Sequence, residues 1–344
     1  MNYKFIIGGL LVITSIGLWL SMNQIDRSLD DPAFITRSAK EFQEFKTTFK
    51  KSYSTIDDAS FRFKIFTYNL KMIEEHNAKG ESYTMAINQF ADLTYDEFHD
   101  KYLSPMKDDP ESKCDKKTVD QPELEEDLQK VDWVTAKKVQ KVKNQEQCGS
   151  CWAFSAVGAL ESAYAIYKNT DVPNLSVQEL VDCGKPYGNN GCNGGLMNLA
   201  FDYILDNKLN TEKDYPYKGR DQKCDDNKKG HGAYGLESCV QVEPNTNGLT
   251  DALKQQPVSV ALHAGYSLMF YSSGVYDPWF CYGEPNHGVL AVGFDLNASK
   301  PYFKIQNSWS ERWGEKGYFR IAIGKKPDGV CKIAGSGANY YPVV

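Results

Sequence analysis

A cysteine at the start of an apolar stretch is the first residue of this chain that could do covalent chemistry. Cys151 ends the segment CGSC and is followed by Trp152 and a run of Ala, Phe, Val, Leu and Tyr at helical spacing up to Tyr167. A thiol at a helix N-terminus lies beside unpaired backbone N–H groups, whose partial positive charge stabilises the thiolate. The sequence therefore predicts that Cys151 is a nucleophile, provided that a histidine lies nearby.

The chain has five histidines that could act as its base. His76 and His99 lie in the N-terminal third, and His231 lies in a polar loop flanked by glycines. His287 lies in NHGVL, at the mouth of an apolar strand and 136 residues after Cys151. A single histidine at a strand end is more often structural than catalytic. Its sequence context therefore has to decide.

Asn307 supplies part of that context. It lies in QNSW, after a β run and before the glycine-rich segment WGEKGY at residues 313–318. An asparagine at a strand end is ordinarily a turn residue. Taken together, CGSCW, NHG, NSW and WGEKGY resemble the papain-like cysteine proteases, and among them the cathepsin L-like group.

The resemblance implies a role for each polar residue of the site. The side chain of Asn307 would fix the imidazole of His287, and Trp309 would shield the pair from water. Gln145 would supply a side-chain amide to the oxyanion hole, beside the backbone N–H of Cys151. The thiolate would attack a peptide carbonyl, and protonated His287 would give its proton to the leaving amine before activating the water that hydrolyses the thioester. No cofactor or metal is implied.

The same resemblance gives the residues that line the substrate cleft. They are Gly194, Gly195, Leu196, Met197, Ala261, Asn286, Trp309 and Ser336. Leu196 and Met197 would form the wall of the main specificity pocket and Ala261 its floor, which favours an apolar side chain at the second substrate residue before the cut (P2). From composition alone, Leu196 and Met197 could equally be core residues. Ser336 stands where some relatives carry a Glu that admits Arg, so we expect no strong preference for Arg. Glu146, where the family often has Gly, adds a carboxylate near the cleft.

Two other classes of function would use the same cysteines. Cys148 and Cys151 could form a redox dithiol, or could join Cys183 and Cys192 in a zinc site. A thioredoxin-like motif usually has its Trp before the first Cys, and a zinc site would leave His287 without a role. A relative that binds without catalysis would typically lack the nucleophile. Peptide hydrolysis is therefore the favoured function.

The N-terminal third carries its own motifs. Six residues step by four, four, three, four and four, and so share one helix face: Asp58, Arg62, Phe66, Asn69, Ile73 and Asn77. Periodicity alone would favour a core helix, but the residue types resemble the ERFNIN pattern of cathepsin L-like propeptides, with Asp58 in place of Glu. The second propeptide motif, GxNxFxD, is matched by Asn88, Phe90 and Asp92, with Ala86 in place of Gly. We therefore expect a propeptide that inhibits its own enzyme until acid protonates Asp92 and its neighbours.

Composition fits a globular protein routed through the secretory pathway. The 344 residues are 41% hydrophobic, with a net charge of −6 and no basic patch suited to nucleic acid. Residues 5–22 are nearly all apolar and are typical of a signal peptide, or of a signal anchor just long enough to cross a bilayer. We expect a lysosomal, vacuolar or extracellular protein. The sequons at Asn174 and Asn297 are candidate glycosylation sites.

We therefore divide the chain into three parts. Residues 1–22 form the signal peptide or anchor, 23–126 the inhibitory propeptide, and 127–344 the mature peptidase domain. The segment 101–126 is polar and contains three prolines, which favours an exposed linker that proteases cut near Asp127. As partners we expect protein and peptide substrates, the chain's own propeptide and cystatin-type inhibitors, with the enzyme a monomer. No exopeptidase-type insertion is evident near residues 187–195, so endopeptidase activity is favoured.

Nine cysteines in an oxidising compartment favour disulfides, with one cysteine left for chemistry. The resemblance implies the pairs Cys148 with Cys192, Cys183 with Cys224, and Cys281 with Cys331. Cys114 and Cys239 have no counterpart in the family. They could form a bridge from the linker to the mature domain, although we favour two free thiols.

The periodicity predicts an α+β fold. A helix at 152–167, a second from a capping box of Ser176 and Glu179 to Cys183, and a third within 199–205 precede four β runs, at 258–262, 288–294, 302–306 and 318–323. A helical half followed by a β half favours two lobes with a cleft between them. By resemblance these are the helical and β-barrel-like lobes of the papain-like fold.

Overall fold

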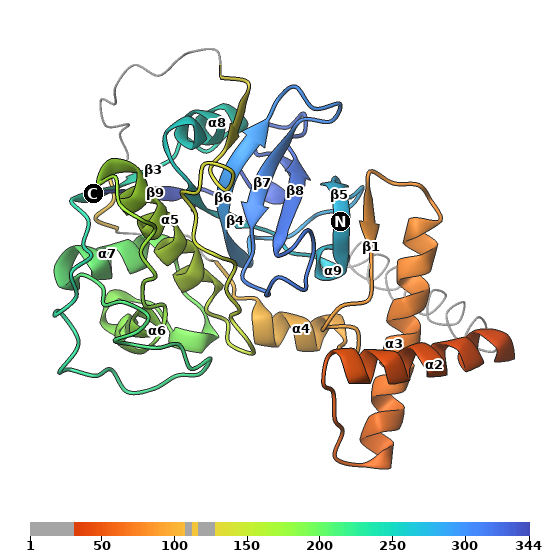
Figure 1. Cartoon of the computed structure of the whole chain (residues 1–344). Helices are drawn as coiled ribbons and strands as arrows, with labels where there is room; N and C mark the ends of the chain where they lie inside the picture. The colour runs from red at the N-terminus through yellow and green to blue at the C-terminus, as the bar shows by residue number, and fades with distance from the viewer. Residues whose placement is uncertain (1–30, 107–111, 116–127) are drawn as a thin grey trace, which may run out of the picture. The chain divides into compact units, whose positions relative to one another are not determined.

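The computed structural model describes residues 31–106, 112–115 and 128–344 (Figure 1). The predicted signal segment at 1–22 and the expected start of the mature domain at Asp127 lie outside the described residues. The chain forms two compact units, which we call the N-terminal unit (residues up to 79, with 86–94) and the main unit (80–85 and 95–344). Within the described part of the chain, no helix is both long enough and apolar enough to cross a membrane.

Among its described residues, the N-terminal unit contains the helices α2 (Pro32–Thr48) and α3 (Ile56–Asn77). The start of α3 is fixed by Thr55, whose side chain accepts the backbone N–H of Asp58 at 3.0 Å. The ring of Phe66 lies 5.3 Å from that of Phe42 and 5.1 Å from that of Phe45, measured between centroids. The two helices therefore share an aromatic core.

The helix face predicted from the four-and-three spacing holds the loop at 86–94. Arg62 Nη1 donates to the backbone oxygen of Asp92 at 3.0 Å. Asn69 Nδ2 donates to the backbone oxygens of Ala91 at 2.9 Å and Leu93 at 3.0 Å, with Asn69 fully buried. The two propeptide motifs therefore form one structure.

The side chain of Asp92 is a second tie within this unit. Its carboxylate accepts from Lys51 Nζ at 2.8 Å and from the hydroxyl of Tyr53 at 3.0 Å, and it is 3% exposed. A carboxylate so enclosed is stable only with such partners. Asp92 thus joins the loop to the segment between α2 and α3.

The main unit begins with a short strand and a helix, and its other helices follow later in the chain. Its helices are α4 (Tyr95–Tyr102), α5 (Cys151–Tyr167), α6 (Gln178–Cys183), α7 (Met197–Asn207), α8 (Thr246–Gln255) and α9 (Tyr266–Met269), with 3₁₀ turns at Lys185–Tyr187, Gly191–Asn193 and Val330–Lys332. Helix α5 is buried on nearly every side, as expected from its apolar composition. A Cβ on Gly158 would lie 3.0 Å from Leu290 Cδ2, so glycine permits close packing there.

A single sheet forms the rest of the main unit. Its strands are β1 (Tyr83–Met85), β2 (Lys130–Asp132), β3 (Ser238–Gln241), β4 (Val258–Leu262), β5 (Tyr271–Tyr276), β6 (His287–Asp295), β7 (Tyr302–Gln306), β8 (Tyr318–Ala322) and β9 (Tyr340–Val343). Their order is β1-β5-β8-β7-β6-β4-β9-β3, and β2 pairs with β6. The pairs are antiparallel apart from β5 with β8. Strand β6 is buried along its whole length, and α5 packs against it (Figure 1).

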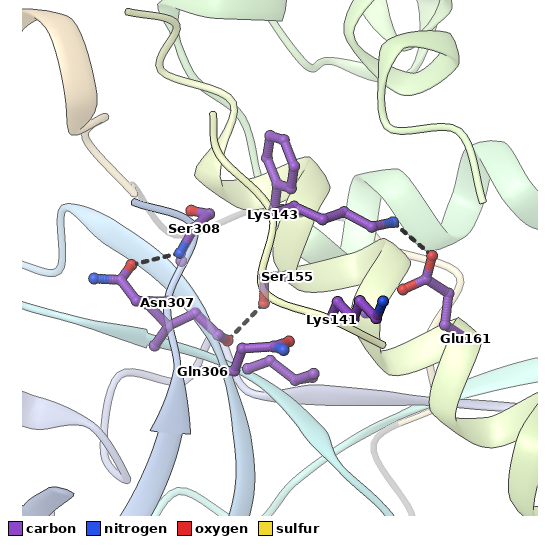
Figure 2. Close-up of a pocket in the computed structure, with 12 residues that line it drawn as sticks. Lys141, Lys143, Ser155, Glu161, Gln306, Asn307 and Ser308 are labelled. Carbon is purple, nitrogen blue, oxygen red and sulfur yellow. Dashed lines mark hydrogen bonds and ion pairs between the residues drawn. The ribbon is translucent and has the colours of Figure 1, made fainter. Parts of the chain in front are cut away.

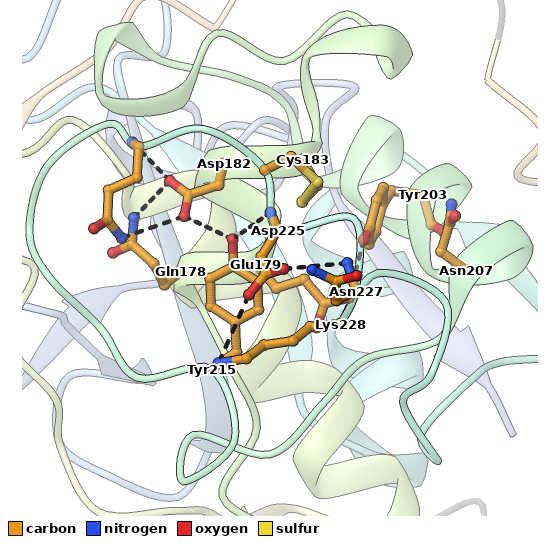
Figure 3. Close-up of a disulfide and its surroundings, with 12 residues drawn as sticks. Gln178, Glu179, Asp182, Cys183, Tyr203, Asn207, Tyr215, Asp225, Asn227 and Lys228 are labelled. Atoms are coloured by element: carbon orange, nitrogen blue, oxygen red, sulfur yellow. Dashed lines mark hydrogen bonds and ion pairs between the residues drawn. A yellow bond between two sulfur atoms is a disulfide. The ribbon is translucent and has the colours of Figure 1, made fainter.

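The α+β class is confirmed, but the predicted capping box forms only in part. The backbone N–H of Glu179 donates to Ser176 Oγ at 3.1 Å, as a capping box requires. The Glu179 carboxylate does not return the bond, because it accepts from the hydroxyl of Tyr203 and the backbone N–H of Asn210, both at 2.9 Å. Figure 3 shows Glu179 with Tyr203 beside Cys183. Helix α6 accordingly begins at Gln178.

The prediction of an exposed linker from residue 101 holds for only some of the described residues of that segment, among them Pro105, Lys113 and Asp115. Leu103, Ser104, Met106 and Cys114 are all buried, with 1% to 8% of their surface exposed. The reason is backbone pairing, since the N–H of Ser104 donates to a backbone oxygen at residue 286. A polar composition does not predict such pairing.

Four disulfides hold the main unit together. They are Cys114–Cys239, Cys148–Cys192, Cys183–Cys224 and Cys281–Cys331. Three are the pairs that the resemblance implies. The first joins the two cysteines that we expected to be free, and the expectation failed because their Cα atoms, far apart in sequence, lie 4.5 Å apart. All nine cysteines are described, and Cys151 alone among them is unbridged.

Candidate active site

The sulfur of Cys151 lies at the junction of α5 and β6. Cys151 is the first residue of α5 and is fully buried. Its sulfur accepts from the backbone N–H of Gly288, the residue after His287 at the start of β6. The hydroxyl of Ser104 lies 3.8 Å from the sulfur. Cys151 thus contacts the segment that carries His287, although the two residues are 136 positions apart in the sequence.

His287 is held in a fixed tautomer. Its Nε2 lies 2.8 Å from Asn307 Oδ1, which also accepts the backbone N–H of Ser308 at 2.8 Å. Because Oδ1 only accepts, Nε2 carries the proton. Nδ1 has no hydrogen-bond partner among the described residues, so its lone pair is available. The indole of Trp309 stacks on the imidazole at 4.6 Å between centroids.

Burial shifts the pKa values of both reacting groups toward their neutral forms. It lowers the pKa of His287 to about 4, although the hydrogen bond to Asn307 opposes the shift. It also raises the pKa of the Cys151 thiol, against the N–H of Gly288 and the hydroxyl of Ser104. The expectation of a helix-stabilised thiolate is therefore not met here, because desolvation outweighs the helix N-terminus.

Gln145 is fixed by hydrogen bonds at both ends of its carboxamide. Its Nε2 donates to the backbone oxygens of Tyr102 at 2.9 Å and Cys148 at 2.8 Å. Its Oε1 accepts the hydroxyl of Ser308 at 2.7 Å. The amide that the resemblance assigns to an oxyanion hole therefore already binds a carbonyl oxygen, that of Tyr102 at the end of α4.

The chain after α4 runs beside the sulfur. The N–H of Ser104 donates to the backbone oxygen of Asn286 at 2.8 Å, and that of Met106 donates to the oxygen of Pro285 at 3.0 Å. A Cβ on Gly194 would lie 2.7 Å from Ser104 Cβ, which leaves no room between them. Residues 103–106 thus lie beside Cys151 and are paired with the segment that precedes His287.

The predicted pocket residues gather around Met106. If Gly288 carried a Cβ, that atom would lie 2.9 Å from Met106 Cε and 3.2 Å from Met197 Sδ. Both methionine side chains therefore reach the backbone at Gly288. Met106, Met197 and Ala261 belong to one buried apolar cluster, with Leu196 packed against it. Cys151 belongs to the same cluster, so these apolar side chains lie in one packed group with the nucleophile.

Three further predicted cleft residues, Ser336, Asn286 and Gly195, each have close contacts of their own. Ser336 Oγ donates to Asn339 Oδ1 at 3.0 Å, and the same oxygen accepts the N–H of Ala261 at 3.1 Å. Ser336 is therefore brought near the predicted pocket floor. The side chain of Asn286 instead binds the backbone of Ala264, at 2.7 Å from its Oδ1 to the amide nitrogen. Gly195 has no room for a Cβ, which would lie 2.4 Å from Asn189 Oδ1.

Tyr217 supports the site and was missed from the sequence. Its hydroxyl donates to the backbone oxygen of Gln145 at 2.8 Å and lies 2.7 Å from Ser150 Oγ. Its ring meets that of Phe154 edge to face at 5.0 Å. Tyr217 therefore fixes the loop that carries Gln145. No periodicity or motif spacing links it to Cys151, so only the three-dimensional structure could find it.

A small cavity lies behind the site (Figure 2). It measures about 20 Å³ and is lined by residues of α5, β6 and β7 and by Lys143. Lys143 Nζ pairs with Glu161 at 2.6 Å, and the hydroxyl of Ser155 donates to the backbone oxygen of Val289 at 2.7 Å. A space of this size could hold one water molecule. It adjoins Asn307 and so belongs to the network that holds His287.

The bridges also bear on the alternative uses of the cysteines. Cys148 is bonded to Cys192 and not to Cys151, and Cys183 is bonded to Cys224. In this state, neither a dithiol at Cys148 and Cys151 nor a zinc site with these thiols can form.

Comparison with known proteins identifies two families along the chain. Residues 128–341 match the papain family cysteine protease, and residues 42–98 match the cathepsin propeptide inhibitor domain. The chain is 44% identical over 280 residues to the probable cysteine protease RD21B of Arabidopsis thaliana, covering 79% of this chain and 59% of that protein. It is 40% identical over 299 residues to the cysteine protease XCP2 of the same plant, covering 85% of this chain and 83% of XCP2.

A solved structure is similar over both parts. The digestive procathepsin L 3 of Tenebrio molitor larval midgut is 34% identical, with a TM-score of 0.78, over 89% of this chain and 99% of that one. The match covers the described propeptide and peptidase regions alike. The chain therefore belongs to the papain family of cysteine proteases and carries a cathepsin-type propeptide inhibitor domain in the same polypeptide.

Proposed function

We propose that this zymogen matures into an endopeptidase in which Cys151 is the nucleophile and His287 the general acid and base. Asn307 orients the imidazole, and Gln145 with the backbone N–H of Cys151 forms the oxyanion hole. The observation that carries this proposal is that three segments far apart in sequence meet around Cys151 and His287. The unbridged Cys151 contacts the residue after His287, and His287 Nε2 is bound to Asn307.

Catalysis would begin when residues 103–106 leave the cleft. Water then reaches the pair, the penalty of burial falls, and a proton moves from the thiol to Nδ1 of His287. The thiolate attacks the substrate carbonyl while Gln145, released from Tyr102, binds the oxyanion. The imidazolium protonates the leaving amine, and a water deprotonated by the neutral imidazole then hydrolyses the thioester.

The pocket favours an apolar P2 side chain. In the zymogen, the thioether of Met106 fills the space next to Met197 and Gly288, which indicates the size and polarity of the group that binds there. Ser336 contributes a neutral hydroxyl and no charge. Substrates with Leu, Phe or Met at P2 would therefore be cut faster than those with Arg.

We further propose activation at acidic pH in a lysosome, a vacuole or the extracellular space. The apolar stretch at 5–22 supports entry into the secretory pathway as a signal peptide or anchor, and four disulfides fit an oxidising compartment. The propeptide would end near residue 126. The neutral, buried His287 supports acid activation, because protonating it favours the opened state.

Active-site labelling combined with matched histidine variants tests the proposal. The precursor is acidified, labelled with a thiol-alkylating epoxide, and assayed on fluorogenic peptide amides with Leu or Arg at P2. We expect labelling at Cys151 and hydrolysis, both lost in Cys151→Ala and reduced by at least about 10²-fold in His287→Ala. His231→Ala, which changes an exposed histidine, should behave like the parent. Equal activity of the two histidine variants would overturn the assignment.

A further inference from the structure

The disulfide Cys114–Cys239 crosses the boundary that processing must break. Cys114 lies before the expected mature N-terminus, and Cys239 lies in β3 of the peptidase domain, 125 residues later. The other three bridges have both cysteines after that boundary. A cut in the intervening chain therefore leaves the residues before it covalently attached.

Residues 112–115 are held by more than the bridge. The N–H of Asp115 donates to the backbone oxygen of Cys239 at 2.7 Å. The backbone oxygen of Asp115 accepts the N–H of Gln241 at 2.9 Å. Asp115 thus pairs in parallel with Val240, on the edge of the sheet that β3 forms. This geometry makes Cys114 part of the folded peptidase surface.

Side chains of α7 add a polar contact to the same segment. The backbone N–H of Lys113 donates to Asp202 Oδ1 at 3.0 Å, and Lys113 Nζ pairs with Asp206 at 2.8 Å. Cys114 is 8% exposed and Cys239 is fully buried. The sulfurs are therefore shielded from a soluble thiol while the segment stays in place.

Both ends of the linker are anchored separately. Strand β2, from Lys130, pairs with β6, while Met106 is paired with Pro285 in the cleft. Hydrolysis of one peptide bond between Asp115 and Lys130 adds one water and leaves the disulfide intact. After that cut, the inhibitory residues 103–106 remain tethered to the enzyme at high effective concentration.

We propose that Cys114–Cys239 makes activation a two-cut process and leaves a disulfide-linked fragment on the mature enzyme. The first cut, after Asp115, opens the chain without freeing the cleft. A second cut, on the N-terminal side of Cys114, releases the inhibitory segment and leaves the residues around Cys114 on the β3 edge. This inference rests on the proposed function, since it concerns how that enzyme is released.

Mass measurement before and after reduction tests the tether. The processed enzyme, blocked with N-ethylmaleimide, is weighed intact and again after treatment with dithiothreitol. We expect reduction to release a peptide that contains residues 112–115. In the variant Cys114→Ser with Cys239→Ser, no peptide should be released. The variant Cys281→Ser with Cys331→Ser is the control, because it keeps the tether and should still release one.

The activity of singly cut molecules tests whether the tethered segment still inhibits the enzyme. We expect singly cut molecules of the Cys114→Ser, Cys239→Ser variant to be at least about tenfold more active than those of the parent, because the inhibitory segment can diffuse away. A processed parent enzyme without the Cys114 peptide would overturn the tether. Equal activity of the singly cut parent and variant would overturn the two-cut order.

The precursor of Cys151→Ala separates this inference from the proposed function. It is digested without reduction, and the peptide that joins Cys114 to Cys239 is sought by mass spectrometry. Its absence overturns the inference whatever the activity of the enzyme. If the joined peptide is found while Cys151→Ala still hydrolyses substrate, the proposed nucleophile is wrong and the bridge stands.

Discussion

At the scale of single residues, the side chain of Asn307 decides the state of the proposed base. Its Oδ1 holds Nε2–H of His287, and this bond raises the pKa of the imidazole against the effect of burial. In the open enzyme, loss of the bond would destabilise the imidazolium. Asn307→Ala should therefore lower kcat by about 10²-fold and move the alkaline limb of kcat/KM to lower pH.

The pH profile separates this role from a structural one. The control is Asn297→Ala, which changes an exposed asparagine and should leave both limbs in place. A fall in activity with an unshifted alkaline limb would contradict a role in orienting His287.

Ser336 lets the specificity pocket be tested by charge. Its hydroxyl is partly exposed and is tied through Asn339 to Ala261. Ser336→Glu would place a carboxylate near a P2 side chain. We expect the ratio of kcat/KM for Arg over Leu at P2 to rise by about tenfold, equivalent to about 1.4 kcal/mol. Ser299→Glu, at an exposed turn, is the control, and the same ratio in both variants would place Ser336 outside the pocket.

At the scale of elements, the propeptide unit depends on the enclosed carboxylate of Asp92. It accepts Lys51 and Tyr53 while the backbone of the same loop binds Arg62 and Asn69. In Asp92→Asn, the charge-assisted bond to Lys51 would be lost, at a cost of about 1.5–3 kcal/mol. Hydrogen exchange in α2 and α3 of the full precursor should therefore become faster.

The measurement uses the Cys151→Ala background, so that processing does not intervene. Glu44→Gln removes an exposed acid from α2 and should change exchange little. Unchanged exchange in Asp92→Asn would show that the loop is held by its backbone bonds alone.

The predictable elements are those whose signals are local. Helix α5 and strands β4 and β7 appear at their predicted positions, because each is an apolar run or a periodic stretch. Helix α4 was missed, since it buries only Phe98. Strand β1 has three residues and gains its stability from pairing with β5, which no local pattern reports.

The candidate site was predictable to a similar degree. Short motifs indicated that Cys151, His287 and Asn307 should lie together. The motifs could not indicate the directions in which the two pKa values are shifted, because these depend on how deeply the folded chain buries both groups. The pairing of Cys114 with Cys239 was equally hidden, since it rests on the packing of a segment 125 residues away.

At the scale of the whole molecule, the closed precursor should be sensitive to acid through His287. Its pKa is about 4 when buried, against an ordinary value near 6.5. Between these values the closed state binds fewer protons than the opened state, so its stability falls as the pH drops. The stabilisation of the closed state by neutral His287 is complete above pH 6.5. It would be about 3 kcal/mol smaller near pH 4.

Hydrogen exchange in residues 95–106 reports this opening. In Cys151→Ala precursor, we expect opening to increase by up to about 10²-fold from pH 7 to pH 4, after correction for intrinsic exchange. In the same protein with His287→Gln, the side chain cannot be protonated, and the increase should be much smaller. Because carboxylates elsewhere titrate equally in both proteins, the difference isolates His287. If the two proteins open in parallel as the pH falls, a group other than His287 drives the opening.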